Sequence, residues 1–486
     1  MAKAQLQSQL NFTQASLQFT YFTVSKDHHI PQVQPRDYLL ALFDVPLRTL
    51  VWIAQLKAGM WVRNGLGLRH QMNTFRQVAQ REITSQRDIF LLQTALVVLP
   101  PETFLASIVD RFHMSDLVNG STDVPLNWED HHLMDVAEDF VHLLIVLVSD
   151  RTGLRPADED PNPELSQAVR EIAHTLCFKP LPFSDLTDRI THSTTTVAGF
   201  NELLTSIAHY KPPEGLQDSG TFELKSEYFN EIDPYNYYYS KNQREEAENA
   251  WKRNEAKRVG ASVDEIVFEP HMRPIRTGLF TELAAFTQTP LFGQVIWGML
   301  HLALHPTAIG KIPTNRVEAF LPLVLYLMLV AIAEDKGTDV APCPAESFID
   351  AALITSVDSQ EAEQSSSNTI LGQLLRLRDA QGLHQTSKVK IRRVIQRLRD
   401  MRPQTFQQTV QEQGLAFDEA QETPSKEVAA REMAEKKRKA QERNARVMAS
   451  FKQQQNDFMS QQMGEDDLGE WSDLGEDVEM RDVGVR

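Results

Sequence analysis

The stretch from Asp44 to Gln93 constrains the fold of this chain most, because its apolar residues recur at the three- and four-residue spacing of a buried helix face. Asp44 is suited to cap the first of three such runs, with Pro46 in its first turn and Asn64-Gly65 at its end. We therefore predict three helices in one tightly packed corner. The apolar positions are Leu47, Leu50, Val51, Ala54, Ala58 and Trp61 in the first run and Leu68, Met72 and Phe75 in the second, and the third run, residues 87–99, is apolar nearly all round.

Four charged residues interrupt this apolar corner: Arg63, Arg69, Arg87 and Asp88. An unpaired charge in such surroundings is costly, so we expect these side chains to be paired or to lie at an interface. An arginine–aspartate pair that joins two helices is favoured over a ligand site.

Two segments of the corner carry a family resemblance. Trp61-Val-Arg-Asn-Gly-Leu66, followed by Arg87-Asp-Ile-Phe-Leu-Leu-Gln93, resembles the large N-recognin ubiquitin ligases, fungal members above all. These RING-type ligases recognise destabilising N-terminal residues of substrates. The likeness continues more loosely to about residue 460, in the same order. It covers the central region of the family and leaves out the zinc-binding UBR box and the RING.

Composition limits the chemistry. The chain has 486 residues, a net charge of −17 and two cysteines, Cys177 and Cys343. The acidic balance repels nucleic acid, and two cysteines are too few for a multi-cysteine zinc site or a disulfide framework. The i,i+4 pair Glu138–His142 is the best metal candidate, and it has no evident third ligand. We therefore predict no catalytic residue and no metal ligand in this chain.

Targeting signals are also missing from the sequence. The N-terminus is glutamine-rich and has no apolar signal segment. The longest apolar run, residues 320–333, falls short of the ~20 residues that span a bilayer, so we predict a buried core helix. We expect no membrane contact and a cytoplasmic location, with the nucleus left open.

The predicted fold class is mainly α, an irregular multi-helix scaffold with an inserted winged-helix (α+β) unit and a long basic C-terminal helix. Breaks in periodicity and composition divide the chain into eight parts. They are a polar leader (1–38), a helical domain (39–150), a linker (151–162), a winged-helix domain (163–228), a second helical domain (229–402), a linker (403–425), a basic helix (426–462) and an acidic disordered tail (463–486).

The winged-helix unit follows from three short helical runs and a strand. Asn162 and Pro163 open the first run, Ser184 caps the second, residues 197–210 form the third, and residues 221–225 alternate like a strand. The third run would be the DNA-recognition helix, yet it has no lysine or arginine. A structural or protein-binding unit is therefore favoured, and the resembling family carries a winged helix here. We expect the aromatic run 228–239 to pack the next helix onto this unit.

The last candidate site is the basic helix, which is made of strong helix formers with glutamate-to-lysine pairs at i,i+4. A solvated spacer and a nuclear-import patch at residues 436–439 both remain open. In the resembling ligases a basic helix before the RING binds the ubiquitin-conjugating enzyme. The resemblance thus implies that this partner is bound by Lys436, Lys437, Arg438, Lys439, Arg443, Val447, Met448 and Phe451.

The resemblance implies the scaffold region of a ubiquitin-protein ligase of the N-degron pathway. A stand-alone protein-binding adaptor and a nucleic-acid-binding winged-helix protein are the alternatives. Zinc is expected only in the UBR box and RING of a full-length relative, so this chain is predicted to need no cofactor and to be inactive alone. Its substrates would be bound by regions outside it. The sequence leaves open whether it is a fragment, a truncated gene model or a short paralogue.

Overall fold

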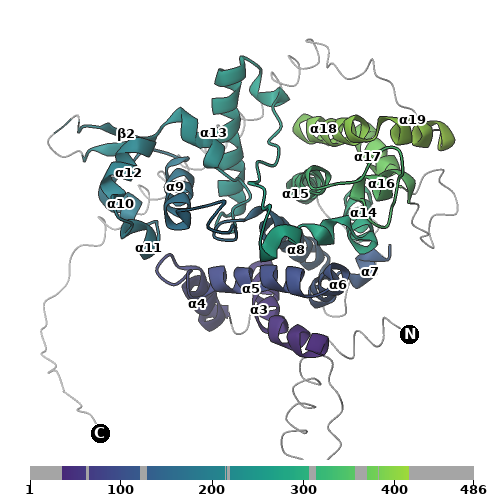
Figure 1. The fold of residues 1–486 in the computed structure, drawn as a ribbon, viewed down its shortest axis with the longest axis horizontal. Coiled ribbons are helices and arrows are strands. Elements are labelled where there is room, and N and C mark those ends of the chain that lie inside the picture. Colours follow the sequence, from purple (N-terminus) through teal and green to yellow (C-terminus); the bar gives the residue numbers. More distant parts are fainter. Residues whose placement is uncertain are drawn as a thin grey trace, which may run out of the picture. The chain divides into compact units, whose positions relative to one another are not determined.

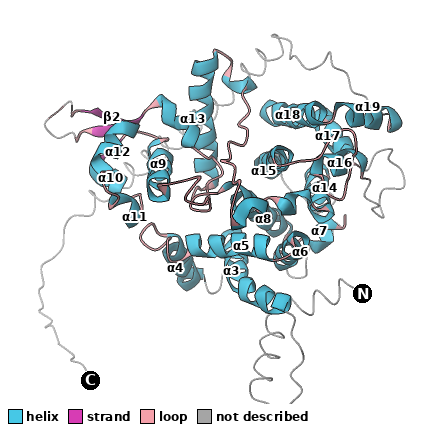
Figure 2. Ribbon diagram, viewed as in Figure 1, coloured by secondary structure: helices cyan, strands magenta, loops and turns pink. Residues whose placement is uncertain are grey.

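The computed structural model describes residues 35–61, 65–120, 128–213, 215, 219–305, 314–355, 369–380 and 383–414. Helices dominate these ranges, and the strands gather in one small sheet beside α12 (Figures 1 and 2). The prediction of a mainly α scaffold with a winged-helix unit is confirmed. The basic helix and the acidic tail lie outside the described residues. The N-terminal helices are α3 (Pro35–Ala58), α4 (Gly65–Arg76), α5 (Ser85–Val98), α6 (Pro101–Arg111), α7 (Ser115–Val118) and α8 (Asp130–Ser149).

The predicted corner exists as α3, α4 and α5, but the expected start and end of its first helix are wrong. Helix α3 begins at Pro35, so Asp44 and Pro46 both lie inside it. The Asp44 carboxylate accepts hydrogen bonds from Nε and Nη2 of Arg111 in α6, at 2.5 and 3.0 Å. Gly59, with φ +89°, follows the last residue of α3, because a left-handed residue there costs glycine little.

The predicted helix-joining pair was assigned to the wrong residues. Arg87 and Asp88 are neighbours within α5, their charged atoms lie 4.0 Å apart, and 64% of the Arg87 side chain is exposed. Arg69 is exposed, and Arg63 lies outside the described residues. Asp44 and Arg111 instead form an ion pair that joins two helices of this region, α3 and α6. Sequence spacing missed it because the two residues are 67 positions apart.

Helix α15 (Thr314–Ala333) lies at the centre of the scaffold and contacts α8, α18 (Gln385–Met401) and α14 (Pro290–Leu304). The 20-residue helix is longer than the predicted apolar run, and both α3 and α15 have the length and apolar composition of a membrane span. Burial argues against a membrane span for α15, since 72% of its apolar segment Arg316–Ala333 is buried inside the protein. The prediction of a buried core helix is therefore confirmed.

The predicted helices and strand of the winged-helix unit occur in the expected order, with an additional strand, Leu181–Pro182, and an additional short helix, His192–Thr195, between them. A helix does extend from Pro163, but the second predicted helix runs only from Phe183 to Thr187 and the third ends at Ile207. Residues 208–211 form a strand because they pair antiparallel with residues 221–224, which overrides their helical periodicity. The elements are α9 (Pro163–Leu176), β1 (Leu181–Pro182), α10 (Phe183–Thr187), α11 (His192–Thr195), α12 (Phe200–Ile207), β2 (Ala208–Lys211) and β3 (Thr221–Leu224), with sheet order β1-β3-β2.

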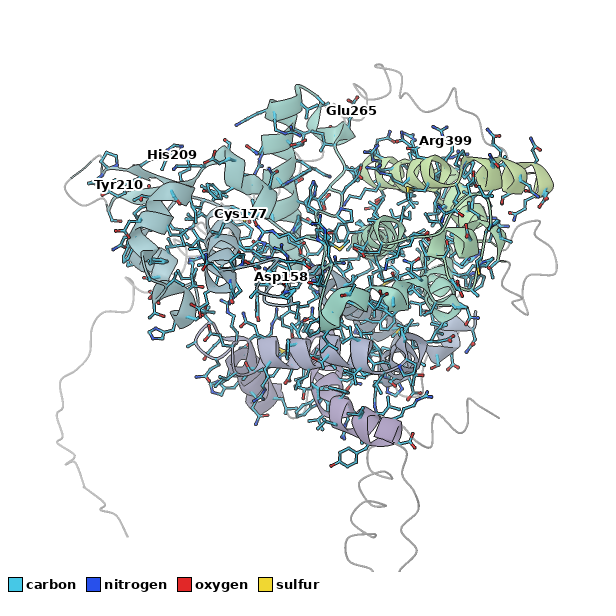
Figure 3. The ribbon with its side chains drawn as sticks, in the orientation of Figure 1. Asp158, Cys177, His209, Tyr210, Glu265 and Arg399 are labelled. Carbon is cyan, nitrogen blue, oxygen red and sulfur yellow. The ribbon has the colours of Figure 1, made fainter. Side chains whose placement is uncertain are left out.

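The core of this unit buries Ile172 and Leu176 of α9 against Leu204 and Ile207 of α12. Cys177 lies in the same core, whereas His209 and Tyr210 on the edge strand β2 are exposed (Figure 3). Burial raises the pKa of the Cys177 thiol to about 12, so this cysteine is an inert core residue at neutral pH.

Among the remaining helices, α16 (Phe348–Ile354) and α17 (Ile370–Asp379) contact α14, and α19 (Pro403–Glu412) contacts α16 and α18. Residues 403–412, predicted as linker, form a helix with Phe406 buried. Helix α14 starts at Pro290, after two 3-10 turns. These elements are η2 (Ser226–Glu231), α13 (Lys241–Val259), η3 (Val263–Glu265), η4 (Leu279–Glu282), η5 (Ala285–Gln288), α16 (Phe348–Ile354), α17 (Ile370–Asp379) and α19 (Pro403–Glu412).

Candidate functional site

The sequence-predicted partner site lies outside the described residues. This concerns all eight positions: Lys436, Lys437, Arg438, Lys439, Arg443, Val447, Met448 and Phe451. Among the described ranges, polar and ionisable side chains concentrate where the winged-helix unit meets α8, α13 and α15. This region, the junction, is the candidate functional site.

Helix α13 joins two sides of the scaffold through buried carboxylates. Ser240 and Gln243 cap its start reciprocally in a capping box. Glu138 of α8, whose side chain is 4% exposed, accepts a 2.6 Å hydrogen bond from Arg244 and pairs with Lys241. One side of the helix buries Ala247, Ala250, Trp251 and Ala256, and these charge contacts hold its polar side.

At its second contact, Glu248 of α13 pairs with Lys390 of α18 and with Lys252, both at 2.7 Å. Although burial opposes ionisation, the two lysines hold the pKa of Glu248 at about 2. The carboxylate is therefore charged at neutral pH and links α13 to α18.

The same contacts argue against the Glu138–His142 metal pair considered from sequence. Both carboxylate oxygens of Glu138 bind cations of α13, and Nε2 of His142 donates to the carbonyl oxygen of Tyr235 at 2.8 Å. A second cluster, Glu129, His131 and His132, has ligand atoms within 4.8 Å of one another. Its His132 Nδ1 accepts the backbone N–H of Glu129, so the neutral ring carries its proton on Nε2 and cannot ligate without breaking this cap. We therefore assign it no metal chemistry.

The aromatic run contacts the winged-helix unit at one end. The hydroxyl of Tyr239 donates to the carbonyl oxygen of His174 in α9 at 2.7 Å. This contact agrees with the expected packing against the winged-helix unit. Tyr239 is 9% exposed, so the ring is not available for stacking on nucleobases.

Three tyrosines of the run, Tyr235, Tyr237 and Tyr238, contact the helical scaffold, which the sequence did not indicate. Tyr235 stacks on Tyr326 of α15 with ring centroids 3.9 Å apart. The Arg76 guanidinium lies 5.3 Å from the Tyr237 ring centroid, and the Arg81 guanidinium 4.3 Å from that of Tyr238. One short segment thus fixes the winged-helix unit to α15 and to the α4–α5 region.

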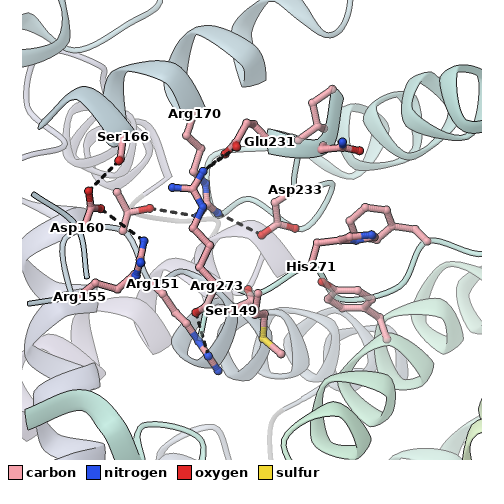
Figure 4. Close-up of a pocket in the computed structure, with 16 residues that line it drawn as sticks. Ser149, Arg151, Arg155, Asp160, Ser166, Arg170, Glu231, Asp233, His271 and Arg273 are labelled. Carbon is pink, nitrogen blue, oxygen red and sulfur yellow. Dashed lines mark hydrogen bonds and ion pairs between the residues drawn. The ribbon is translucent and has the colours of Figure 1, made fainter. Parts of the chain in front are cut away.

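A polar cavity of about 100 Å³ lies at the junction and is shown in Figure 4. Two of its ion pairs are Arg170–Asp233 at 3.3 Å and Arg273–Glu231 at 2.6 Å. Its walls come from the end of α8, the predicted linker, α9, η2 and residues 268–273. Its lining residues are Ser149, Arg151, Thr152, Arg155, Asp160, Ser166, Arg170, Asn230, Glu231, Ile232, Asp233, Phe268, His271, Met272, Arg273 and Tyr326.

The predicted linker 151–162 is packed into this junction. The Glu159 carboxylate accepts backbone N–H bonds from Arg276 and Thr277 at 2.9 and 2.8 Å, and Arg151 donates to Glu334 of the loop after α15 at 2.7 Å. These long-range contacts explain why a segment poor in apolar residues is ordered.

The junction predicts a loss of stability in acid. Burial lowers the pKa of both His142 and His174 well below the usual 6.5. Between about pH 6.5 and the lowered folded pKa the unfolded chain binds protons that the folded chain does not, so stability falls as pH decreases. We expect urea unfolding at pH 7.5 and 5.5 to show this loss. The free energy of unfolding of His142→Gln should fall less between these pH values than that of the unaltered chain. The exposed control His209→Gln should lose as much as the unaltered chain does. An identical pH dependence in all three proteins would contradict the assignment.

The recognition-helix position carries few free cations. Glu202 is the one formal charge within α12, and Lys225 donates to the carbonyl oxygens of Thr205 and Ser206 at its end. Lys211 on the edge strand pairs with Glu223. A face whose nearest lysines are already paired offers little phosphate neutralisation.

Comparison with known proteins agrees with this architecture. Residues 167–266 match the family model of the E3 ubiquitin-protein ligase UBR1-like winged-helix domain, and residues 12–143 match the UBR1/2/3-like ARM repeat domain. The chain is 29% identical to E3 ubiquitin-protein ligase ubr1 of Schizosaccharomyces pombe, over 87% of this chain and 21% of the relative. It is 25% identical to human E3 ubiquitin-protein ligase UBR2, over 86% of this chain and 24% of the relative.

A further relative is E3 ubiquitin-protein ligase UBR2 of Saccharomyces cerevisiae, 26% identical over 88% of this chain and 22% of the relative. The chain thus spans between a fifth and a quarter of the length of these relatives. The resemblance noted in residues 61–93 is confirmed by matches that extend over most of the chain. Its ARM-repeat and winged-helix matches, together with these relatives, show that the chain belongs to the UBR family of N-recognins.

Proposed function

We propose that the chain is the scaffold region of an N-recognin-type ubiquitin ligase of the N-degron pathway. The observation that carries this proposal is the presence of a UBR1/2/3-like ARM repeat domain and a UBR1-like winged-helix domain in one chain. Relatives that align with most of the chain are named E3 ubiquitin-protein ligases. The junction supports a scaffold role, since Glu138, Glu248 and the tyrosines hold the winged-helix unit in one position on the helices.

The proposed partner is a ubiquitin-conjugating enzyme, bound by the basic run within residues 426–451. Lys436, Lys437 and Lys439 would face an acidic surface and raise the association rate. Val447, Met448 and Phe451 follow at helical spacing and would add an apolar anchor in a helix-in-groove contact. Protein substrates would be bound by other parts of a full ligase. In this proposal the protein acts in the cytoplasm, with the nucleus as a second location.

The test is a titration of the full chain with its cognate ubiquitin-conjugating enzyme at low and physiological salt. Reversal of Lys436, Lys437 and Lys439 to glutamate should abolish binding, and Phe451→Ala should weaken it with little change in salt dependence. The matched control reverses Lys179, Arg253 and Lys257, three exposed cations elsewhere on the chain, with the same change in net charge. Unchanged affinity after the first reversal would leave the run as a spacer.

The two cysteines give no support for a zinc site, because Cys177 is a buried core thiol and Cys343 is 166 positions away in the sequence. In this proposal the zinc of the pathway belongs to a UBR box and a RING, and polypeptide 1–486 alone forms no ubiquitin chains. An adaptor that belongs to no ligase is the second candidate, and it would bind proteins but no ubiquitin-conjugating enzyme. A nucleic-acid-binding role has less support, since Glu202 is the only formal charge on α12.

A further inference from the structure

We propose that the junction cavity binds a phosphate group, as inorganic phosphate or as a small phosphomonoester, between the winged-helix unit and the helical scaffold. Four arginines and three carboxylates line the cavity, and two of the arginines also pair with carboxylates outside the lining, Arg151 with Glu334 and Arg170 with Asp150. Both sides of the junction contribute, because α9 and η2 belong to the winged-helix side and the end of α8 and α15 to the scaffold (Figure 4). The charged lining residues are Arg151, Arg155, Arg170 and Arg273 with Asp160, Glu231 and Asp233.

Three of these arginines already have close partners. Arg273 donates to both oxygens of Glu231 at 2.6 and 2.7 Å, and Arg170 donates to Asp233 and Thr152. Arg151 donates to Glu334 and to the carbonyl oxygens of Val148 and Arg273. Its bond to Val148 covers a carbonyl at the end of α8, which would otherwise repel an anion. These side chains form the walls of the cavity.

Arg155 differs from the other three. Its Nη2 donates to the backbone carbonyl oxygen of Glu159 at 2.5 Å, whereas its buried Nε has no hydrogen-bond partner. The nearest carboxylate oxygens, on Glu159 and Asp160, lie 3.9 Å from its nitrogens, beyond hydrogen-bonding distance. The Glu159 carboxylate is instead held by the backbone of Arg276 and Thr277. A buried guanidinium N–H therefore remains available at the cavity.

Ser149 supplies a second unsatisfied group. The residue is 7% exposed, and its hydroxyl oxygen is buried without a hydrogen-bond partner. Ser149 and Arg155 line the same cavity, in which about 100 Å³ is open to a ligand larger than one water. Burying an unpaired polar group is costly, so two of them at one cavity favour an occupant that accepts hydrogen bonds from both.

A phosphate group meets these requirements. Its oxygens accept from a hydroxyl and from an arginine N–H, the two groups that Ser149 and Arg155 leave without a partner at the cavity. Ser166, in the first turn of α9, also lines the cavity, so the positive end of that helix dipole lies nearby. A bound phosphate would tie α8 and its following segment to the winged-helix unit and would stabilise the junction.

The experiment measures binding of inorganic phosphate and of O-phosphoserine to the full chain by calorimetry, and their effect on Tm, at constant ionic strength. We expect saturable binding of phosphate and a raised Tm, with chloride at the same ionic strength inactive. Arg155→Gln should weaken phosphate binding about tenfold or more, because it removes a charge-assisted hydrogen bond. Ser149→Ala should weaken it less, and the exposed matched control Arg253→Gln should bind as the unaltered chain does.

The results distinguish a site for inorganic phosphate, a site for phosphomonoesters and a cavity that holds only water. Binding of both ligands supports an open site that accepts monoesters, and binding of inorganic phosphate alone supports an enclosed site for the free ion. Failure of both ligands to bind the unaltered chain, or equal affinity in Arg155→Gln, would overturn the proposal and leave a water-filled cavity. If Arg155→Gln does not fold, Ser149→Ala and the titration of the unaltered chain decide. Failure here would leave the conjugating-enzyme titration unaffected, since that test concerns residues 436–451.

Discussion

Replacing Arg402 with alanine is expected to lower the free energy of unfolding by about 3–5 kcal/mol, because it leaves two buried carboxylates without their counter-ion. The Arg402 side chain is 2% exposed. Its Nη2 donates to Asp335 at 2.7 Å and its Nε to Asp350 at 3.0 Å. Asp335 in turn accepts from Ser347 and from the backbone N–H of Ile349. The network joins the end of α15, the start of α16 and the start of α19.

Urea unfolding followed by circular dichroism measures the effect. Arg397→Ala is the matched control, since Arg397 also pairs with a carboxylate, that of Glu269, while 42% of its side chain is exposed. Such a surface pair contributes about 0–1 kcal/mol. Equal losses for Arg402→Ala and Arg397→Ala would mean that burial of the network adds nothing. Gly337 offers a second test, because a Cβ there would lie 2.4 Å from Nη2 of Arg402, so Gly337→Ala should disturb the same network.

Replacing Glu138 with alanine is expected to destabilise the chain by about 3 kcal/mol, because it leaves Arg244 in the junction without its partner carboxylate. Glu138 is 4% and Arg244 11% exposed in their side chains. The loss should change little between low and high salt, since buried pairs are screened less than surface pairs. Hydrogen exchange should show faster opening of α13 in the variant, because Glu138 holds the N-terminal end of that helix.

The control for this prediction is Glu164→Ala, an exposed glutamate in the first turn of α9. Its effect should stay within about 0.5 kcal/mol. A loss below about 1 kcal/mol for Glu138→Ala, or one that disappears in high salt, would show that the pair behaves as a surface contact.

The sequence predicted the helices and strands that are marked by apolar spacing or capping residues within the element itself. The apolar runs at residues 87–99 and 320–333 predicted α5 and α15, because apolar residues at helical spacing are typical of a buried helix. The plan of the winged-helix unit followed from Pro163 at a helix start and the alternation in residues 221–224. The family resemblance also rested on contiguous residues, those from Trp61 to Gln93.

Contacts between residues far apart in the chain decided the rest. Asp44 looked like a helix cap, but pairing with Arg111 places it inside α3. Residues 208–211 kept a helical period, yet β3 draws them into the sheet. Residues 403–412 are polar and were predicted as linker, while Phe406 and the Arg402 network anchor them as α19. Pairing energies of this kind depend on burial and on distances that no local pattern encodes.

The junction cavity shows the same division most clearly. The sequence supplied the polar, proline-rich segment 151–162 and the amphipathic helix that follows it, and it identified both as separate elements. Only the tertiary structure brings Ser149, Arg155 and Arg170 to one cavity, since their environments are set by residues 230–233 and 268–273. Whether a buried polar group has a partner depends on the whole fold, because partners at this cavity lie 63 positions away for Arg170 and 183 for Arg151.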